Sequence, residues 1–191
     1  MAALFSSSSS SAKASSSSAS SASFPLIHSP ATCSTQSLAR SLLLTTPAPF
    51  AVYASSQSAG RGTSSRTWLS PPGNLYLTVC LPAEQVAKPG FPLTLLPLHA
   101  GVVTHEAIER LLPEEERPSL TLKWPNDVLL GGEKISGSII ELDAAGSGKG
   151  TFLIGIGVNV AVAPEVPTEG PEHGRPSTCL LSHLPPPSPP D

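Results

Sequence analysis

The sequence predicts an α+β fold built on a mixed, largely antiparallel sheet that is flanked by helices. Three observations lead to this expectation: strand-like segments dominate residues 49–162, short turns join several of them, and one stretch has helical spacing of its apolar residues. Short hairpin turns join antiparallel neighbours, whereas parallel strands need a long crossover between them. We therefore expect a mixed sheet rather than a doubly wound parallel one.

The N-terminal part of the expected fold carries four elements. Apolar residues alone suggest a short strand over residues 24–27 and a helix over residues 38–44. Residues 49–54 are apolar and run into a glycine-rich segment, and residues 74–81 alternate apolar and polar side chains as a half-buried strand does. Two strands are therefore expected on either side of a glycine loop.

The C-terminal part begins with the clearest helix of the sequence. Pro97 occupies a first-turn position, and apolar spacing continues through Leu98, Val102, His105, Ile108 and Leu112 until Pro113. Four strands are expected after it, at residues 120–123, 128–130, 134–142 and 152–162. Gly131 and Gly132 are expected to form the hairpin turn between the second and third of these strands.

The two ends of the 191-residue chain offer little that could form a core. Residues 1–23 are almost entirely Ser and Ala, and residues 185–191 are rich in Pro. The first segment is expected to be disordered, and its composition fits either a transit peptide or a plain low-complexity tail. The expected location is the plastid, with the mitochondrion or the cytoplasm as alternatives. The expected folded domain spans residues 24–184.

Charge and cysteine content argue against several classes of protein. The net charge of -3 gives no electrostatic reason to expect a nucleic-acid partner. No apolar run reaches the roughly 18 to 20 residues of a membrane-spanning helix, so no membrane partner is expected. Three cysteines lie far apart, and neither they nor the five histidines show the spacing of metal ligands, so no metal-binding residue is expected.

The segment 57–62 (QSAGRG) is a candidate anion-binding loop. Its glycines let the backbone approach a ligand closely, and Arg61 offers a forked cation that pairs with phosphate or carboxylate. Taken alone, the segment is more simply a flexible turn of no special function, since Gly and Ser are common turn formers.

Residues 123–127 (KWPND) form a rarer pattern. Trp and Pro would fix a turn at a strand end and hold Lys123, Asn126 and Asp127 in set directions, although a purely structural corner remains an alternative. Residues 134–137 and 155–159 place glycines inside strands, which marks either a bulge or the close approach of a ligand. Residues 146–149 lack the first glycine and the final Ser or Thr of a nucleotide P-loop, and we interpret them as a polar hairpin.

Taken in order, these motifs resemble those of the biotin protein ligases. In that family a Ser-Thr-Asn/Gln/His motif precedes a Gly-Arg-Gly-Arg loop, followed by Trp-x-Ser-Pro-x-Gly, Lys-Trp-Pro-Asn-Asp, Lys-x-x-Gly and Gly-x-Gly-x-Asn. The matching segments here are 34–36, 57–62, 68–73, 123–127, 134–137 and 155–159, and the likeness extends over residues 24–184. The resemblance implies the fold shared with lipoate ligases and class II aminoacyl-tRNA synthetases.

The resemblance also implies an activity: ATP-dependent conversion of biotin to biotinyl-AMP, and transfer of biotin to a lysine of the biotin carboxyl carrier domain of a carboxylase. ATP and Mg²⁺ would be the cofactors. Two alternatives stay open, namely a lipoate or octanoate ligase and a biotin-binding fragment without catalysis. The second arises because relatives continue with helices and a small β-barrel where this chain turns into its Pro-rich end.

Roles for individual residues follow from the same resemblance. Arg61 and Lys123 would be the catalytic pair, because both would converge on the biotin carboxylate and the α-phosphate of ATP and offset their repulsion. The biotin-binding residues would be Ser34, Thr35, Gln36, Gln57, Gly62, Thr63 and Gly137. The nucleotide-binding residues would be Arg61, Asn126, Asp127 and Asn159. Thr63 departs from the family pattern, which has a second arginine there, and Arg66 is a candidate replacement.

Overall fold

A computed structural model describes residues 25–87, 90–144, 150–167 and 174–186. Residues 1–23, the predicted polar hairpin at 146–149 and residues 187–191 lie outside these ranges, so the predictions made for them stay predictions. Among the described residues, no helix is both long enough and apolar enough to cross a membrane.

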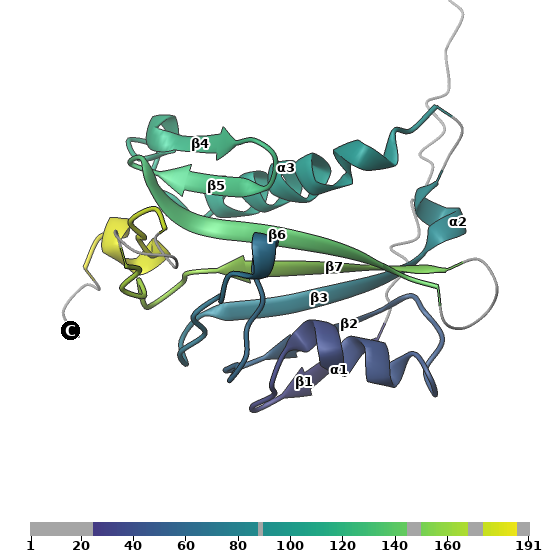
Figure 1. Ribbon diagram of the computed structural model, residues 1–191. Helices are drawn as coiled ribbons and strands as arrows, with labels where there is room; N and C mark the ends of the chain where they lie inside the picture. Colours follow the sequence, from purple (N-terminus) through teal and green to yellow (C-terminus); the bar gives the residue numbers. More distant parts are fainter. Residues whose placement is uncertain (1–24, 88–89, 145–149, 168–173, 187–191) are drawn as a thin grey trace, which may run out of the picture.

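The described part of the chain forms one sheet of seven strands in the order β1-β2-β3-β7-β6-β5-β4 (Figure 1). The pair β1 and β2 is parallel, and the other neighbouring pairs are antiparallel. The expected mixed, largely antiparallel sheet is therefore confirmed. Its strands are β1 Leu26–Ser29, β2 Phe50–Ala54, β3 Leu75–Pro82, β4 Leu120–Lys123, β5 Asp127–Leu130, β6 Glu133–Asp143 and β7 Thr151–Val158.

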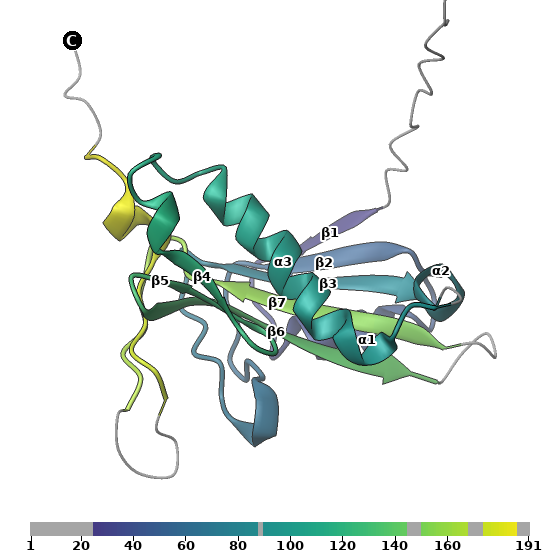
Figure 2. The ribbon, with the colours of Figure 1, turned by 90° about the horizontal axis from the view of Figure 1, so that it is seen from above.

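The longer helices, α1 (Thr35–Leu42) and α3 (Leu96–Glu109), lie on opposite faces of this sheet (Figures 1 and 2). Successive side chains of a strand point to opposite faces, and β7 shows the consequence. Leu153 packs with Ala39 of α1, whereas Phe152 and Ile154 pack with the α3 side. A short helix, α2 (Ala83–Val86), follows β3 and was not predicted.

The helices differ from the sequence prediction at one end or on one face. The helix α1 begins at Thr35 rather than at residue 38, because its first turn presents polar side chains inward instead of an apolar stripe. The helix α3 buries Ala100, Gly101 and Thr104, while the predicted core residue Val102 is 36% exposed. Small side chains let this helix approach the sheet closely, and that face has no strong apolar pattern.

Two strand boundaries also differ from the prediction. The first strand, β1, lies two residues further along than expected, at Leu26–Ser29. The last strand, β7, ends at Val158 rather than at residue 162. Beyond it, the Asn74 side-chain oxygen accepts hydrogen bonds from the backbone N–H groups of residues 160–162, which turns this stretch away from the sheet.

Candidate functional site

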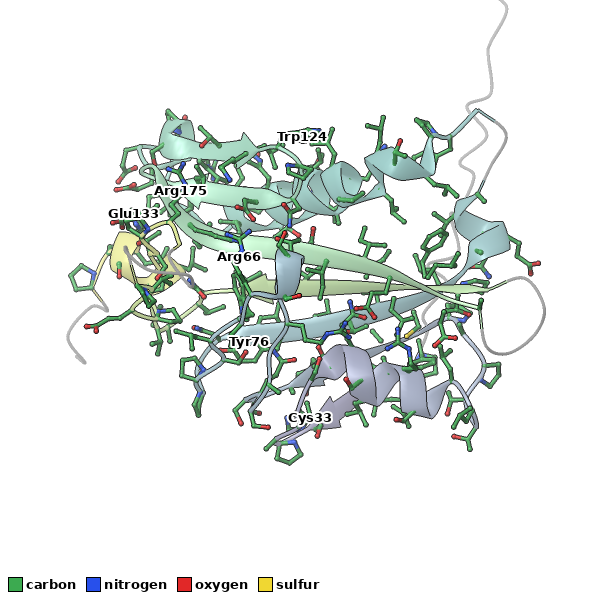
Figure 3. All side chains as sticks on the ribbon, viewed as in Figure 1. Cys33, Arg66, Tyr76, Trp124, Glu133 and Arg175 are labelled. Carbon is green, nitrogen blue, oxygen red and sulfur yellow. The ribbon has the colours of Figure 1, made fainter. Side chains whose placement is uncertain are left out.

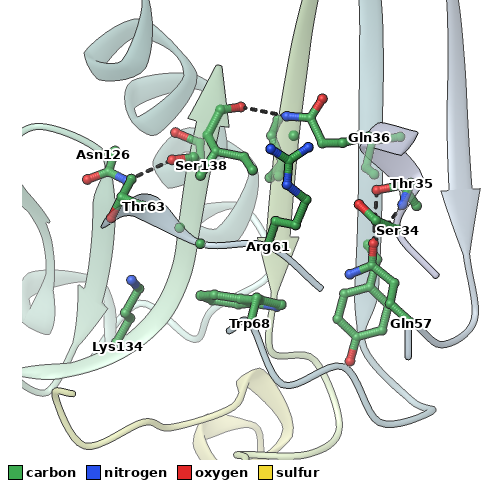
Figure 4. Close-up of a pocket in the computed structure, with 18 residues that line it drawn as sticks. Ser34, Thr35, Gln36, Gln57, Arg61, Thr63, Trp68, Asn126, Lys134 and Ser138 are labelled. Carbon is green, nitrogen blue, oxygen red and sulfur yellow. Dashed lines mark hydrogen bonds between the residues drawn. The ribbon is translucent and has the colours of Figure 1, made fainter. Parts of the chain in front are cut away.

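An inner hollow lies on the α1 face of the sheet, where the start of α1, the glycine loop (residues 57–68) and strands β6 and β7 meet (Figure 4). Its lining is mainly polar or glycine, which suits a ligand that needs both hydrogen bonds and close backbone approach. The lining residues are Ser34, Thr35, Gln36, Gln57, Arg61, Gly62, Thr63, Trp68, Tyr76, Leu77, Asn126, Lys134, Gly137, Ser138, Ile139, Gly155, Ile156 and Gly157.

Gln57 joins the glycine loop to the start of α1. Its side-chain oxygen accepts hydrogen bonds from the backbone N–H of Thr35 at 2.8 Å and from the Thr35 hydroxyl at 3.2 Å. Its amide nitrogen donates to the Ser70 hydroxyl at 2.9 Å. Both polar atoms of the Gln57 amide are therefore engaged by protein partners. Gln57 holds the wall of the hollow in place by fixing Thr35 and Ser70.

Gln36 offers this hollow an unused acceptor. Its side chain is 2% exposed and its amide nitrogen donates to the Ile139 carbonyl at 3.4 Å, while Oε1 has no hydrogen-bond partner in the described structure. Gly155 leaves the necessary space, because a Cβ there would lie 2.9 Å from the Gln36 amide nitrogen. A buried polar atom without a partner is costly, so a ligand donor is the natural complement of Gln36 Oε1.

The tip of the glycine loop is a tight turn with unusual backbone geometry. Ser64 and Ser65 both have positive φ, at 56° and 61°, a region that costs non-glycine residues energy. Gly60 lies so close to the Trp68 carbonyl that a Cβ would have no room. Arg66 folds back on this turn and donates to the Thr63 carbonyl at 3.3 Å and to the Thr63 hydroxyl at 3.2 Å.

Arg61 extends from the loop to strand β6 and forms part of a chain of charges. Its Nη2 lies 2.5 Å from Glu141 Oε1, and Glu141 Oε2 lies 2.6 Å from Arg40 Nη2. Arg40 also donates from Nε to Asp143 Oδ2 at 2.9 Å. The hydrogen bonds to Glu141 and then to Asp143 raise the pKa of Arg40 above its ordinary value, so this cation is fixed in charge as well as in position.

Trp68 forms the wall between the inner hollow and a second, outer one. Its indole lies flat over Gly157, where a Cβ would come within 2.6 Å of the ring. The ammonium of Lys134 lies 5.2 Å from the centre of the Trp68 ring, a cation–π distance. Trp68 and Lys134 line both hollows, as do Gly62 and Thr63.

The outer hollow has a cavity volume of about 700 Å³ and is rich in cations. Arg66, Lys123, Lys134 and Arg175 line it, against the carboxylates Asp127 and Glu165. Several cations around one large cavity favour a polyanionic ligand such as a chain of phosphates. The remaining lining residues are Gly62, Thr63, Thr67, Trp68, Leu69, Asn159, Pro164, Val166, Pro167, Gly174, Pro176 and Ser177.

Asp127 gathers two lysines at the border of the two hollows. Lys134 Nζ lies 2.7 Å from Asp127 Oδ1, and Lys123 Nζ lies 3.4 Å from Oδ2. The Lys134 side chain is 25% exposed and that of Lys123 is 46% exposed. Lys134 is therefore the more enclosed cation, and it reaches both hollows where Lys123 reaches only the outer one.

The turn that joins β4 and β5 is held by Asn126 and not by its tryptophan. Trp124 is 73% exposed (Figure 3). Asn126 Nδ2 donates to the Ser138 carbonyl at 2.7 Å, and the Ser138 N–H donates to the Asn126 carbonyl at 3.0 Å. The predicted fixed corner exists, with a polar bracket to β6 in place of tryptophan packing.

The sequence-predicted site residues divide between the two hollows. Arg61 lines only the inner hollow and Lys123 only the outer one, so the expected convergence of these two cations on one cavity is not seen. The inner hollow also takes Ser34, Thr35, Gln36, Gln57, Gly62, Thr63, Asn126 and Gly137. The outer hollow takes Gly62, Thr63, Lys123, Asp127 and Asn159.

Residues without a sequence-based assignment also contribute to the site, either in its lining or, as Glu141 does, through an ion pair with a lining residue. Trp68 and Lys134 belong to motifs that were recognised as segments, but neither side chain was given a role. Glu141 and Arg175 belong to no motif, and only the folded chain brings them to the site. For Lys134 the signal in the sequence was the Lys-x-x-Gly pattern of residues 134–137. In the structure a bulge in the pairing of β5 with β6 brings the Lys134 side chain beside Gly137.

Comparison with known proteins finds one family. The model of the biotin/lipoate A/B protein ligase family matches residues 24–159. A biotin--[acetyl-CoA-carboxylase] ligase of Paracoccus denitrificans is 37% identical over 114 residues, which cover 60% of this chain and 45% of the relative. The bifunctional ligase/repressor BirA of Bacillus subtilis is 35% identical over 144 residues, which cover 73% of this chain and 41% of the relative.

Solved structures agree with this family. A Leishmania major biotin protein ligase in complex with biotinyl-5-AMP has a TM-score of 0.69 and 33% identity, with 83% of this chain and 64% of that chain covered. An Aquifex aeolicus biotin protein ligase in complex with biotin and ATP has a TM-score of 0.62 and 33% identity, with 83% and 60% covered. The chain spans less than two thirds of the length of these relatives.

Proposed function

Because the chain belongs to the biotin/lipoate A/B protein ligase family, we propose that it activates biotin with ATP and transfers it to a lysine of a biotin carboxyl carrier domain. The observation that carries this proposal is the pair of adjoining hollows that share Lys134 and Trp68. The inner hollow suits a small polar ring system such as that of biotin, and the outer hollow suits the phosphates of ATP. The biotin carboxylate and the α-phosphate would meet at the border between the two hollows.

The first step joins two anions. An oxygen of the biotin carboxylate forms a bond to the α-phosphorus of ATP, the bond from that phosphorus to the bridging oxygen breaks, and pyrophosphate leaves with the electron pair. Lys134 at the shared border would offset the combined negative charge and hold the reactants in line. Lys123, Arg66 and Arg175 would contact the phosphates from the outer hollow.

The second step transfers biotin. The neutral amine of a carrier lysine attacks the carbonyl carbon of biotinyl-AMP, an amide bond forms, AMP leaves, and the amine gives up a proton. The Trp68 wall would shield the mixed anhydride from water until the amine arrives. No protein nucleophile is needed.

The proposal also includes Mg²⁺, with the ion carried by the nucleotide. The described residues contain no cluster of three or more His, Cys, Asp or Glu side chains that could hold a metal ion. Mg²⁺ usually binds through substrate phosphates and one or two carboxylates, and Asp127 is already paired with two lysines. The steps above therefore use side chains of this chain alone.

A location in the plastid stays a prediction. It is supported by the Ser-rich, acid-free residues 1–23. A relative named biotin--protein ligase 1, chloroplastic, from Arabidopsis thaliana is 27% identical over 161 residues.

The test combines binding with transfer. Isothermal titration should detect biotin binding, and mass spectrometry should find a carrier domain heavier by one biotin after incubation with ATP. Lipoate bound in preference to biotin would overturn the substrate, and biotin binding without carrier labelling would overturn the transfer step.

Two matched lysine variants locate the chemistry. We expect Lys134→Gln to slow biotinyl-AMP formation by about 100- to 1000-fold, the usual effect of losing one charged transition-state contact. Lys123→Gln should cost less than about tenfold, because that side chain reaches only the outer, more solvated hollow. Equal losses, or a larger loss for Lys123→Gln, would return the catalytic role to Lys123.

A further inference from the structure

Arg175 is a cation of the outer hollow that belongs to none of the sequence motifs. It lies in the C-terminal segment, residues 174–178, and is labelled in Figure 3. Its Nη1 donates to the Gly132 carbonyl at 3.2 Å, in the turn that joins β5 to β6. This bond holds the guanidinium beside the turn, and its other nitrogens have no hydrogen bond to the described residues.

The cations of the outer hollow differ in their counter-charges. Lys134 and Lys123 share the carboxylate of Asp127, at 2.7 and 3.4 Å. Within the described ranges, neither Arg66 nor Arg175 forms an ion pair. A guanidinium without a carboxylate partner keeps its charge available for an anionic ligand and can hold two phosphate oxygens at once.

Strand β6 fixes the backbone on which Arg175 is carried. The Lys134 N–H donates to the Pro176 carbonyl at 2.8 Å, and the Thr178 N–H donates to the Lys134 carbonyl at 3.1 Å. The buried Asn159 side chain donates to the Thr178 carbonyl at 3.0 Å. Arg175 and Lys134 therefore belong to two segments that are hydrogen-bonded side by side, and both line the outer hollow.

The two hollows give these cations an order along the ligand. Lys134 lines both hollows, whereas Arg175 lines only the outer one. In the proposed reaction the biotin carboxylate meets the α-phosphate at the border, beside Lys134. The β- and γ-phosphates then extend away from the inner hollow, toward the cations that line the outer hollow alone. Negative charge that develops on the leaving group therefore appears at a place where Arg175 can offset it.

We propose that Arg175 binds the two phosphates that leave as pyrophosphate, so that the C-terminal segment supplies a subsite separate from the Lys134 border. When the bond from the α-phosphorus to the bridging oxygen breaks, that oxygen keeps the electron pair, and the guanidinium offsets the added charge. The inference rests on the proposed function for the identity of the nucleotide. The subsite itself can be tested with inorganic pyrophosphate alone.

The first experiment uses inorganic pyrophosphate and AMP as probes and needs no biotin. In titration calorimetry, Arg175→Gln should weaken pyrophosphate binding by about tenfold, the factor that corresponds to one lost hydrogen bond between charged groups. The affinity for AMP should not change, because AMP lacks the phosphates that leave. Arg175→Lys should recover part of the pyrophosphate affinity, because an ammonium keeps the charge but not the paired hydrogen bonds.

Arg110→Gln is the matched control. Arg110 caps the C-terminal end of α3, is exposed as Arg175 is, and lines neither hollow. Its replacement removes the same charge from the chain, so its pyrophosphate affinity should match that of the natural chain.

The second experiment measures biotinyl-AMP formation. Arg175→Gln should raise the KM for ATP and leave the KM for biotin unchanged, whereas a merely structural role would lower the melting temperature and disturb both. No pyrophosphate binding by the natural chain, an equal loss in Arg110→Gln, or an equal loss of AMP and pyrophosphate affinity in Arg175→Gln would each overturn the subsite. If pyrophosphate binds through Arg175 but no biotinyl-AMP forms, the proposed function fails and the subsite stands.

Discussion

At the residue scale, burial decides which groups can react. Cys80 is fully buried beneath α1, and burial first, then the charge of Asp143, raises the pKa of its thiol to about 12. Cys33 is exposed and Cys179 is buried. Thiol reagents should therefore modify Cys33 in the folded chain and reach the other two cysteines only on unfolding.

Cys80 also gives stability a defined pH dependence. The folded state keeps this thiol protonated, so its contribution is complete below the ordinary pKa of 9.0 and is lost as the pH rises from there toward 12. The gap in unfolding free energy between the natural chain and Cys80→Ala should shrink by about 1 kcal/mol from about pH 8 to about pH 10. Urea unfolding at both pH values measures this gap.

A control comes from the exposed cysteine. Cys33→Ala is the matched control, since it removes a thiol that is exposed in the folded chain. If the difference in unfolding free energy between the natural chain and Cys80→Ala does not change with pH, the folded protein accommodates Cys80 as a thiolate.

At the element scale, a substitution that adds one methyl group to β7 tests how the Trp68 indole packs on this strand. Gly157→Ala would place a Cβ about 2.6 Å from the indole, which must then swing away from the wall. We expect biotin affinity to fall by roughly tenfold or more, because the ring compound loses a flat surface to pack on. Titration calorimetry with biotin measures the change.

The matched control is a glycine remote from both hollows. Gly101 lies in α3, and a Cβ there would meet only Leu122, at 3.4 Å. Gly101→Ala should leave biotin affinity unchanged and raise the melting temperature, because alanine favours the helix by about 1 kcal/mol. Full affinity in Gly157→Ala would show that Trp68 is not part of the binding wall.

Strands with a regular pattern of apolar side chains could be predicted from the sequence, and the first turn of α1, which faces the site, could not. The strand β3 shows simple alternation and was predicted within one residue at either end. The start of α1 carries Thr35 and Gln36, which are buried because they line a hollow, so no apolar period marks it. The spacing of apolar residues therefore does not reveal the first turn of α1, which is the part of the helix that lines the site.

The site itself shows the same division. Glycines and motif residues were predictable as segments, since their spacing is local. The ion pair of Arg61 with Glu141 and the meeting of Lys134 with Asp127 depend on how β6 lies beside the loop and beside β5. Such pairings are set by sheet register, which one sequence does not reveal.

At the scale of the whole molecule, Asn159 connects the end of β7, strand β6 and the C-terminal segment. Its Nδ2 donates to the Thr178 carbonyl at 3.0 Å and to the Lys134 carbonyl at 3.4 Å, and the side chain is 2% exposed. The backbone of Lys134 in turn pairs with Pro176 and Thr178. This connection holds residues 174–178 as a wall of the outer hollow.

We expect Asn159→Ala to lower the unfolding free energy by about 2 kcal/mol, because the buried Thr178 carbonyl loses a donor and the part-buried Lys134 carbonyl loses one of its two donors. Limited proteolysis should cut the 163–177 segment faster in this variant. Asn74→Ala offers a comparison, because the half-buried Asn74 side chain bonds residues 160–162 and not the wall at residues 174–178. Unchanged stability in Asn159→Ala would mean that water replaces the lost donor.

The last strand of the described residues, β7, lies in the middle of the sheet. The strand β7 pairs with β3 on one side and with β6 on the other, over its whole length. While the ribosome is still making the chain, β1–β3 and β4–β6 therefore present open edges toward each other, and open edges invite wrong pairing. The two halves can close only when residues 151–158 have left the exit tunnel, so chaperones have most to protect in the nascent chain just before that moment.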